Sequence, residues 1–129
     1  MIVDTSALVA ILRQEPDALM LAKAIDEADT CRISAASFVE ASIVIDTLTR
    51  GAGHLLLDSF MREARIVIEP VSVQQARIAR QAYSDFGRGR HSAGLNFGDC
   101  LAYALAKVSG EPLLFKGEDF RKTDVAAAR

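Results

Sequence analysis

Short apolar runs alternate with longer helical segments along this chain, and the alternation limits the folds open to it. Four runs have strand composition and end at polar or turn residues: 2–3, 31–34, 65–68 and 112–115. The intervening segments predict helices over about 5–13, 16–29, 36–50, 54–64, 73–86 and 97–109. Such short strands, separated by helices, are typical of a parallel sheet covered on both faces. The pattern predicts an α/β fold.

Composition narrows the class of protein. With 129 residues, 50% hydrophobic and 25% charged, the chain suits one domain over 1–129 and is not an intrinsically disordered segment. Its longest apolar run, Cys100–Ala106, is too short to cross a bilayer, and no signal peptide is evident. Cys31 and Cys100 lack metal or redox spacing. We expect a soluble, cytoplasmic protein.

The net charge of −2 conceals an asymmetry between the two parts of the chain. Residues 1–85 carry 8 basic and 12 acidic side chains, whereas residues 86–129 carry 7 and 5. A general basic field for nucleic acid is absent, but the C-terminal third can present a local basic rim.

Four acids occupy notable positions: Asp4, Glu40, Asp99 and Asp119. Asp4 ends the first strand, and Asp119 follows the last strand by four residues. Glu40 and Asp99 each lie near the start of a largely apolar helix. Ligands of open α/β sheets bind at the carboxyl ends of the strands. We expect all four acids to face that edge.

Each acid also has a purely structural interpretation. Asp4 is a good N-cap, and Asp119 suits a turn. Ser37-x-x-Glu40 matches a capping box, and Asn96-x-x-Asp99 approximates one. For each acid alone this interpretation is preferred. It weakens for the set, because neither Glu40 nor Asp99 has a basic neighbour three or four residues away.

Convergence of the acids requires compensation of their charge. Two carboxylates about 4 Å apart repel by roughly 4 kcal/mol at an effective dielectric constant near 20. Either their pKa values rise or a cation neutralises them. A set of carboxylate oxygens favours Mg²⁺ or Mn²⁺ over zinc.

At these residues the chain resembles the PIN-domain ribonucleases and, among them, the VapC toxins of type II toxin–antitoxin systems. The resemblance rests on 1–7 (Met-Ile-Val-Asp-Thr-Ser-Ala), 37–41, 95–100 (Leu-Asn-Phe-Gly-Asp-Cys) and 113–120. It implies a three-layer α/β/α fold with a short-stranded, mainly parallel sheet. It also implies cleavage of RNA with Mg²⁺ or Mn²⁺, homodimerisation, and inhibition by a cognate VapB antitoxin.

By the same resemblance, Asp4, Glu40, Asp99 and Asp119 are the metal ligands and catalytic residues. Glu40 would orient water or act as base, and Asp119 would serve a second, weaker metal site. Glu118 or Asp124 is a candidate to share the role of Asp119, and Thr5 or Ser6 would supply a supporting hydroxyl. Candidates for phosphate contacts, which are equally well explained as solvated surface charges, are Arg88, Arg90, His91, Lys116, Arg121 and Lys122.

Two other classes of function compete with the nuclease. A Mg²⁺-binding phosphoacceptor domain would use Lys116, but it needs paired acids after the first strand, where this chain has Thr5 and Ser6. A non-catalytic interaction domain would use all four acids as caps. Serine or cysteine nucleophiles are not expected, since no Gly-x-Ser-x-Gly elbow is present.

Overall fold

The computed structural model describes all residues, 1–129, and contains the predicted alternation of strands and helices. In chain order the elements are β1 (Ile2–Val3), α1 (Thr5–Leu12), α2 (Ala18–Glu27), β2 (Cys31–Ser34), α3 (Ala35–Thr49), α4 (Gly53–Glu63), β3 (Ile66–Glu69), α5 (Val73–Phe86), α6 (Phe97–Ser109), β4 (Leu113–Leu114) and the 3₁₀ turn η1 (Phe120–Lys122).

The four strands form one parallel sheet in the order β3-β2-β1-β4. Ile2 of β1 is in register with Arg32 of β2 on one side and with Leu113 of β4 on the other. The chain first adds strands on one side of β1 and later returns to add β4 on the opposite side. This reversal beside β1 is the position at which open α/β sheets commonly bind ligands.

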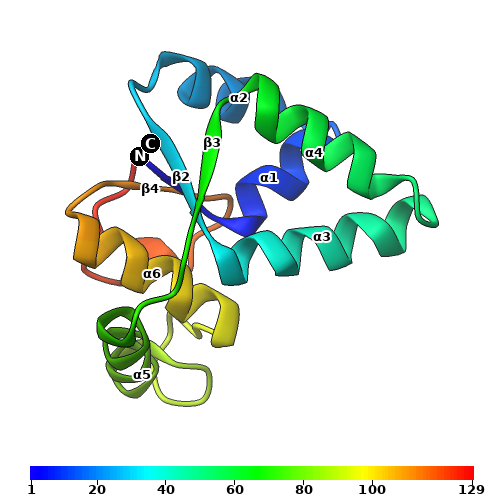
Figure 1. The fold of residues 1–129 in the computed structure, drawn as a ribbon. Helices are drawn as coiled ribbons and strands as arrows, with labels where there is room; N and C mark the ends of the chain where they lie inside the picture. Colours follow the sequence, from blue (N-terminus) through cyan, green and yellow to red (C-terminus); the bar gives the residue numbers. More distant parts are fainter.

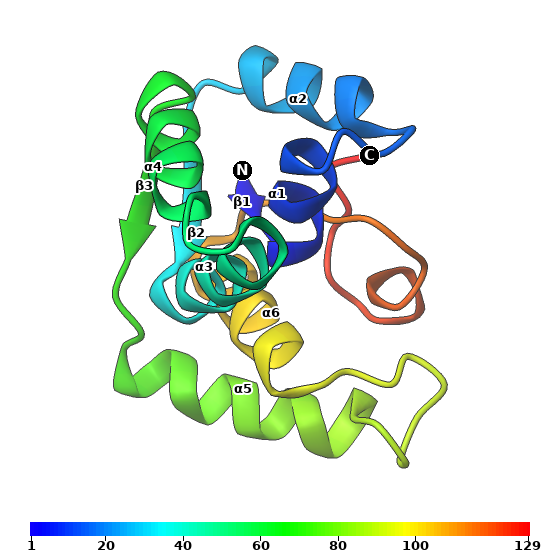
Figure 2. The same ribbon diagram turned by 90° about the vertical axis from the view of Figure 1, so that its right-hand side faces the viewer.

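Helices cover both faces of the sheet, as the sequence predicts. Successive residues of a strand point to opposite faces, and Ile2 and Leu113 accordingly join one apolar core with α5 and α6. Val3 and Leu114 join a second core with side chains from α1 to α4. The result is a three-layer α/β/α arrangement (Figures 1 and 2).

The starts of three helices explain how acids reach one edge of the sheet. Asp4 caps α1, and Ser34, the last residue of β2, caps α3 through a 3.3 Å bond from the Ala36 amide. The capping box predicted from Ser37 and Glu40 is therefore wrong, because α3 begins before Ser37. The N-terminal ends of α1, α3 and α6 lie near one another below the sheet (Figure 1).

None of the helices is both long enough and apolar enough to cross a membrane. Cys31 and Cys100 are buried free thiols, and burial raises the pKa of Cys100 to about 11.

Candidate active site

Asp4 lies at the centre of the carboxyl edge, directly after β1. Its Oδ2 accepts hydrogen bonds from the Ser6 amide at 2.9 Å and the Ser6 hydroxyl at 2.6 Å. Its Oδ1 is buried and has no hydrogen-bond partner. One oxygen of the carboxylate thus caps α1, while the other is available to a ligand.

The environment of Asp4 disfavours its negative charge. Burial raises the pKa of Asp4 to about 6, although the two hydrogen bonds from Ser6 act in the opposite direction. The charges of Asp99 and Glu40 raise this pKa further. A carboxyl group with these properties gains strongly from a nearby cation.

Asp99 likewise uses only one of its two carboxylate oxygens in a helix cap. Its Oδ2 accepts from the Asn96 amide at 3.0 Å, and the Asn96 side chain accepts from the Asp99 amide at 2.9 Å. This capping box at the start of α6 is the one that the sequence predicts. It leaves Oδ1 of Asp99 free. Burial, together with the charges of Glu40 and Asp119, raises the pKa of Asp99.

The remaining two acids complete a group at this edge. Glu40 is partly buried on α3, and its charge acts on both Asp4 and Asp99. Asp119 is exposed at the start of η1 and acts on Asp99. The four predicted acids thus lie along this edge and act on one another through their charges, although no three of them are close enough to form a ready-made metal site. None of the four forms a salt bridge.

The two acids considered as alternatives to Asp119 are engaged elsewhere. Asp124 accepts a hydrogen bond from the Tyr103 hydroxyl and lies 3.2 Å from Lys107 Nζ, and these contacts lower its pKa. Glu118 is paired with Arg121 at 3.7 Å. Among these three acids, Asp119 is the one whose charge raises the pKa of Asp99.

Both predicted hydroxyl groups make contacts that hold the edge together. The Ser6 hydroxyl donates to Asp4 and accepts from the Lys116 amide at 3.0 Å, so it connects the ends of β1 and β4. The Thr5 hydroxyl donates to the Ser37 carbonyl at 3.0 Å and joins α1 to α3. The hydrogen bond from the Lys116 amide to Ser6 could not be predicted from the sequence, because it depends on the pairing of two strands that are distant in the chain.

The candidate RNA contacts fall into two groups. Arg88 lies near the acids, since its charge lowers the pKa of Asp99. The others contact other groups of the protein. Arg90 lies over the Tyr83 ring, and His91 accepts a hydrogen bond from the Ala93 amide. Lys116 pairs with Glu15 and Asp17, whereas Arg121 and Lys122 donate to the carbonyls of Arg129 and Ser92.

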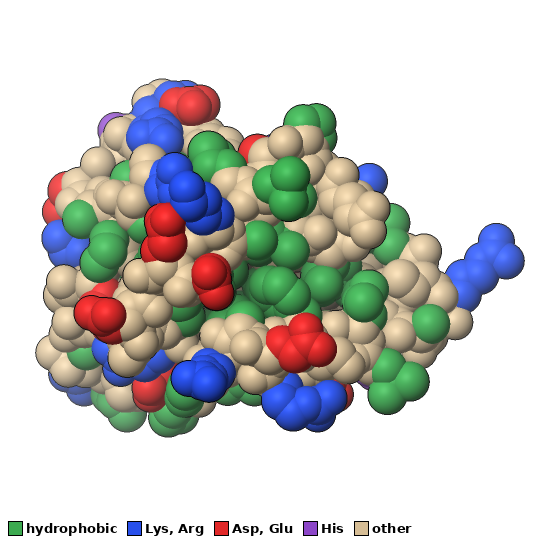
Figure 3. Space-filling view, turned by 90° about the horizontal axis from the view of Figure 1, so that it is seen from above, with side chains coloured by type: hydrophobic (Ala, Val, Ile, Leu, Met, Phe, Trp, Pro, Cys, Tyr) green, Lys and Arg blue, Asp and Glu red, His purple; other side chains and the backbone are tan.

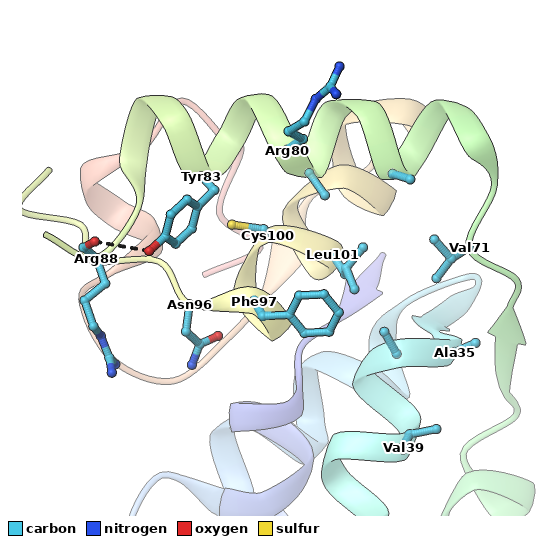
Figure 4. Close-up of a pocket in the computed structure, with 13 residues that line it drawn as sticks. Ala35, Val39, Val71, Arg80, Tyr83, Arg88, Asn96, Phe97, Cys100 and Leu101 are labelled. Carbon is cyan, nitrogen blue, oxygen red and sulfur yellow. Dashed lines mark hydrogen bonds between the residues drawn. The ribbon is translucent and has the colours of Figure 1, made fainter. Parts of the chain in front are cut away.

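An apolar groove of about 1000 Å³ lies beside the acids and was not foreseen from the sequence. It is bounded by α5, the start of α6 and the start of α3 (Figure 4). The Phe97 ring lies between the α6 and α3 sides, and Tyr83 points down from α5 (Figure 4). The residues that line the groove come from segments far apart in the chain, so no local sequence motif predicts it.

The acids suit a hard divalent cation in their chemistry. They present only carboxylate oxygens, which Mg²⁺ prefers, and the buried Oδ1 of Asp4 lacks any partner within the protein. No three His, Cys, Asp or Glu side chains are already grouped as a complete ligand set. Mg²⁺ commonly uses only one or two protein carboxylates and keeps several waters. The residues present therefore fit such an ion.

Comparison with known proteins agrees with this fold. The PIN domain family matches residues 1–126. The chain is 56% identical to ribonuclease VapC28 of Mycobacterium tuberculosis over 129 residues, which cover 99% of this chain and 97% of that protein. The chain therefore belongs to the PIN-domain family and, within it, to the VapC group.

Solved structures show the same fold at low sequence identity. Mycobacterium tuberculosis VapC20, described as a sarcin–ricin loop cleaving toxin, has a TM-score of 0.79 at 12% identity, covering 97% of this chain and 95% of VapC20. VapBC2 from Rickettsia felis, bound to a DNA fragment from its promoter, has a TM-score of 0.77 at 16% identity, covering 98% and 95%.

Proposed function

We propose that this chain, as one domain over 1–129, is a Mg²⁺- or Mn²⁺-dependent endoribonuclease and the toxin of a VapBC pair. The observation that carries the proposal is the set of four acids along this edge, none of which forms a salt bridge. Within this set, Asp4 and Asp99 each use one oxygen for a helix cap. The other oxygen of each carboxylate accepts no hydrogen bond from the protein, and that of Asp4 is buried.

Asp4 and Asp99 would hold the metal ion, with Glu40 and Asp119 beside them. When bound, the ion lowers the pKa of its water and offsets charge on the phosphate that is cleaved. Ser6 fixes the Asp4 carboxylate through two hydrogen bonds, so that Oδ1 keeps its direction. Glu40 would orient the attacking water, and Arg88, whose charge acts on Asp99, would contact the phosphate.

The test is cleavage of total RNA by the purified chain with Mg²⁺, Mn²⁺ or EDTA. Asp99→Asn should lower cleavage by at least about 100-fold, because it replaces a charged metal ligand by a neutral one and weakens binding of the ion that offsets charge on the phosphate. Asp124→Asn is the matched control and should retain activity. Metal-independent cleavage, or equal activity in the Asp99→Asn protein, would reject the proposal. Since the substrate is cellular RNA, we place the protein in the cytoplasm.

We also propose that the chain forms a homodimer through the face around the apolar groove. Val39 and Ile43, 53% and 61% exposed, form a stripe on α3 that continues to Phe97, which is 78% exposed. Monomers seldom expose a continuous apolar face, and a two-fold dimer lets such a face cover itself. Ile43→Glu should give a monomer in size-exclusion chromatography with light scattering. The control Leu55→Glu, on α4, should remain dimeric.

The partner of the toxin would be a cognate VapB antitoxin. Apolar side chains gather in the centre of the face shown in Figure 3. Helices α2 and α4 also carry exposed apolar side chains, Leu19, Met20 and Leu56. Acids at the adjacent ends of these helices, Asp26 and Glu63, favour an apolar segment that carries basic residues. Leu19→Glu should weaken capture of the antitoxin without changing cleavage by the free toxin.

A further inference from the structure

Gly98 lies in the first turn of α6, directly before Asp99, and is buried. Glycine weakens a helix relative to alanine, and it is usually retained where a positive φ or a close approach requires it. Gly98 is not among the residues with positive φ. Of these two reasons, a close approach therefore remains to be examined at this position.

The approaching group is the Glu40 carboxylate. A Cβ placed on residue 98 would lie 2.5 Å from Glu40 Oε2, 2.8 Å from Oε1 and 2.9 Å from Cδ. All three of the nearest atoms thus belong to one acidic side chain. By contrast, a Cβ at Gly53 or Gly87 would also collide with backbone carbonyl oxygens, at 2.8 Å and 2.3 Å.

We propose that Gly98 is a positioning residue for Glu40. Because residue 98 has no side chain, the carboxylate of Glu40 can lie against the first turn of α6, beside Asp99 and close enough to act on Asp4. Helix α6 thereby contributes one acid of the group, Asp99, and the space for another. This inference rests on the proposed function, in which Glu40 acts at the metal.

The test is Gly98→Ala, examined first by Mn²⁺ titration of the metal-free protein. The overlapping atoms are at the end of a flexible side chain, so Glu40 should turn away while the fold is kept. Alanine is the better helix former, and the melting temperature should be unchanged or higher by up to about 4 °C. Mn²⁺ affinity and RNA cleavage should each fall by roughly 10- to 100-fold.

The same substitution in a Glu40→Gln protein distinguishes an effect on the position of the Glu40 carboxylate from a general effect on the structure of the site. With the carboxylate already removed, Gly98→Ala should cause no further loss of Mn²⁺ affinity, and the two changes should be strongly non-additive. Equal losses in both backgrounds, or wild-type Mn²⁺ affinity in Gly98→Ala alone, would overturn the inference.

Two further outcomes are also decisive. If Gly98→Ala lowers the melting temperature, shortening Glu40 to alanine in the same protein should restore it, because no carboxylate remains to overlap; no recovery would overturn the inference. If the wild type cleaves no RNA, the proposed function fails, whereas the Mn²⁺ titration still decides the role of Gly98.

Discussion

Replacing Asp4 by asparagine tests the electrostatics of the site by protein stability alone. The pKa of Asp4 is raised from its ordinary value of 3.8 to about 6, which corresponds to about 3 kcal/mol. Because the folded state holds the proton more tightly than the unfolded state, this stabilisation is complete below pH 3.8. It is lost as the pH rises through about 6. The ionised carboxylate therefore weakens the metal-free fold at neutral pH.

The magnitude is clearest as a difference between two pH values. From about pH 4.5 to about pH 7.5, Asp4 alone should lower the free energy of unfolding by about 2 kcal/mol. Asparagine does not titrate, so Asp4→Asn should lack this contribution. An amide nitrogen without an acceptor at the Oδ1 position would cost about 1–3 kcal/mol. That cost is the same at both pH values and cancels in the comparison.

The assay is urea unfolding in EDTA at the two pH values, with Asp58→Asn, an exposed acid on α4, as control. Asp4→Asn should gain about 2 kcal/mol relative to wild type between the lower and the higher pH. Mg²⁺ should stabilise the wild type and not the variant. If Asp4→Asn is destabilised equally at both pH values, the pKa of Asp4 is not raised in the folded protein, and the reasoning is refuted.

Three other predictions concern neighbouring contacts. Ser6→Ala removes both hydroxyl hydrogen bonds at the β1–β4 junction and should lower Mn²⁺ affinity by about tenfold in calorimetry; unchanged affinity would show that Ser6 does not hold Asp4. Asp119→Asn should slow RNA cleavage, whereas Asp124→Asn should not, and the reverse order in a rate assay would exchange their roles. Tyr103→Phe should lower the free energy of unfolding by about 1 kcal/mol in urea, with cleavage unchanged, because it removes only the bond to Asp124.

The sequence was sufficient for the fold because each local signal agreed with the others. Gly110 ends α6 in the left-handed region, and Ser72 caps α5, so the elements lie within a few residues of their predicted bounds. The wrong prediction of a capping box at Ser37 has a local cause. Ser34 and Ser37 both precede helix-forming residues, and the position of the cap depends on where β2 stops pairing with β3.

The sequence indicates which acids are candidates for the site, but not how each carboxylate uses its two oxygens. From sequence, a helix cap and a metal ligand are competing interpretations of Asp4 and Asp99. The structure shows that they are compatible, because a carboxylate has two oxygens and each cap uses only one. The contact between Gly98 and Glu40 joins two helices distant in sequence, and no spacing rule reveals it.

The most direct test of a shared metal site is an anomalous difference map from crystals soaked in Mn²⁺. The account predicts a peak within ligand distance of Oδ1 of Asp4 and Oδ1 of Asp99, with Oδ2 of Asp4 still bound to Ser6. A peak elsewhere, or one that draws Oδ2 of Asp4 away from Ser6, would contradict it.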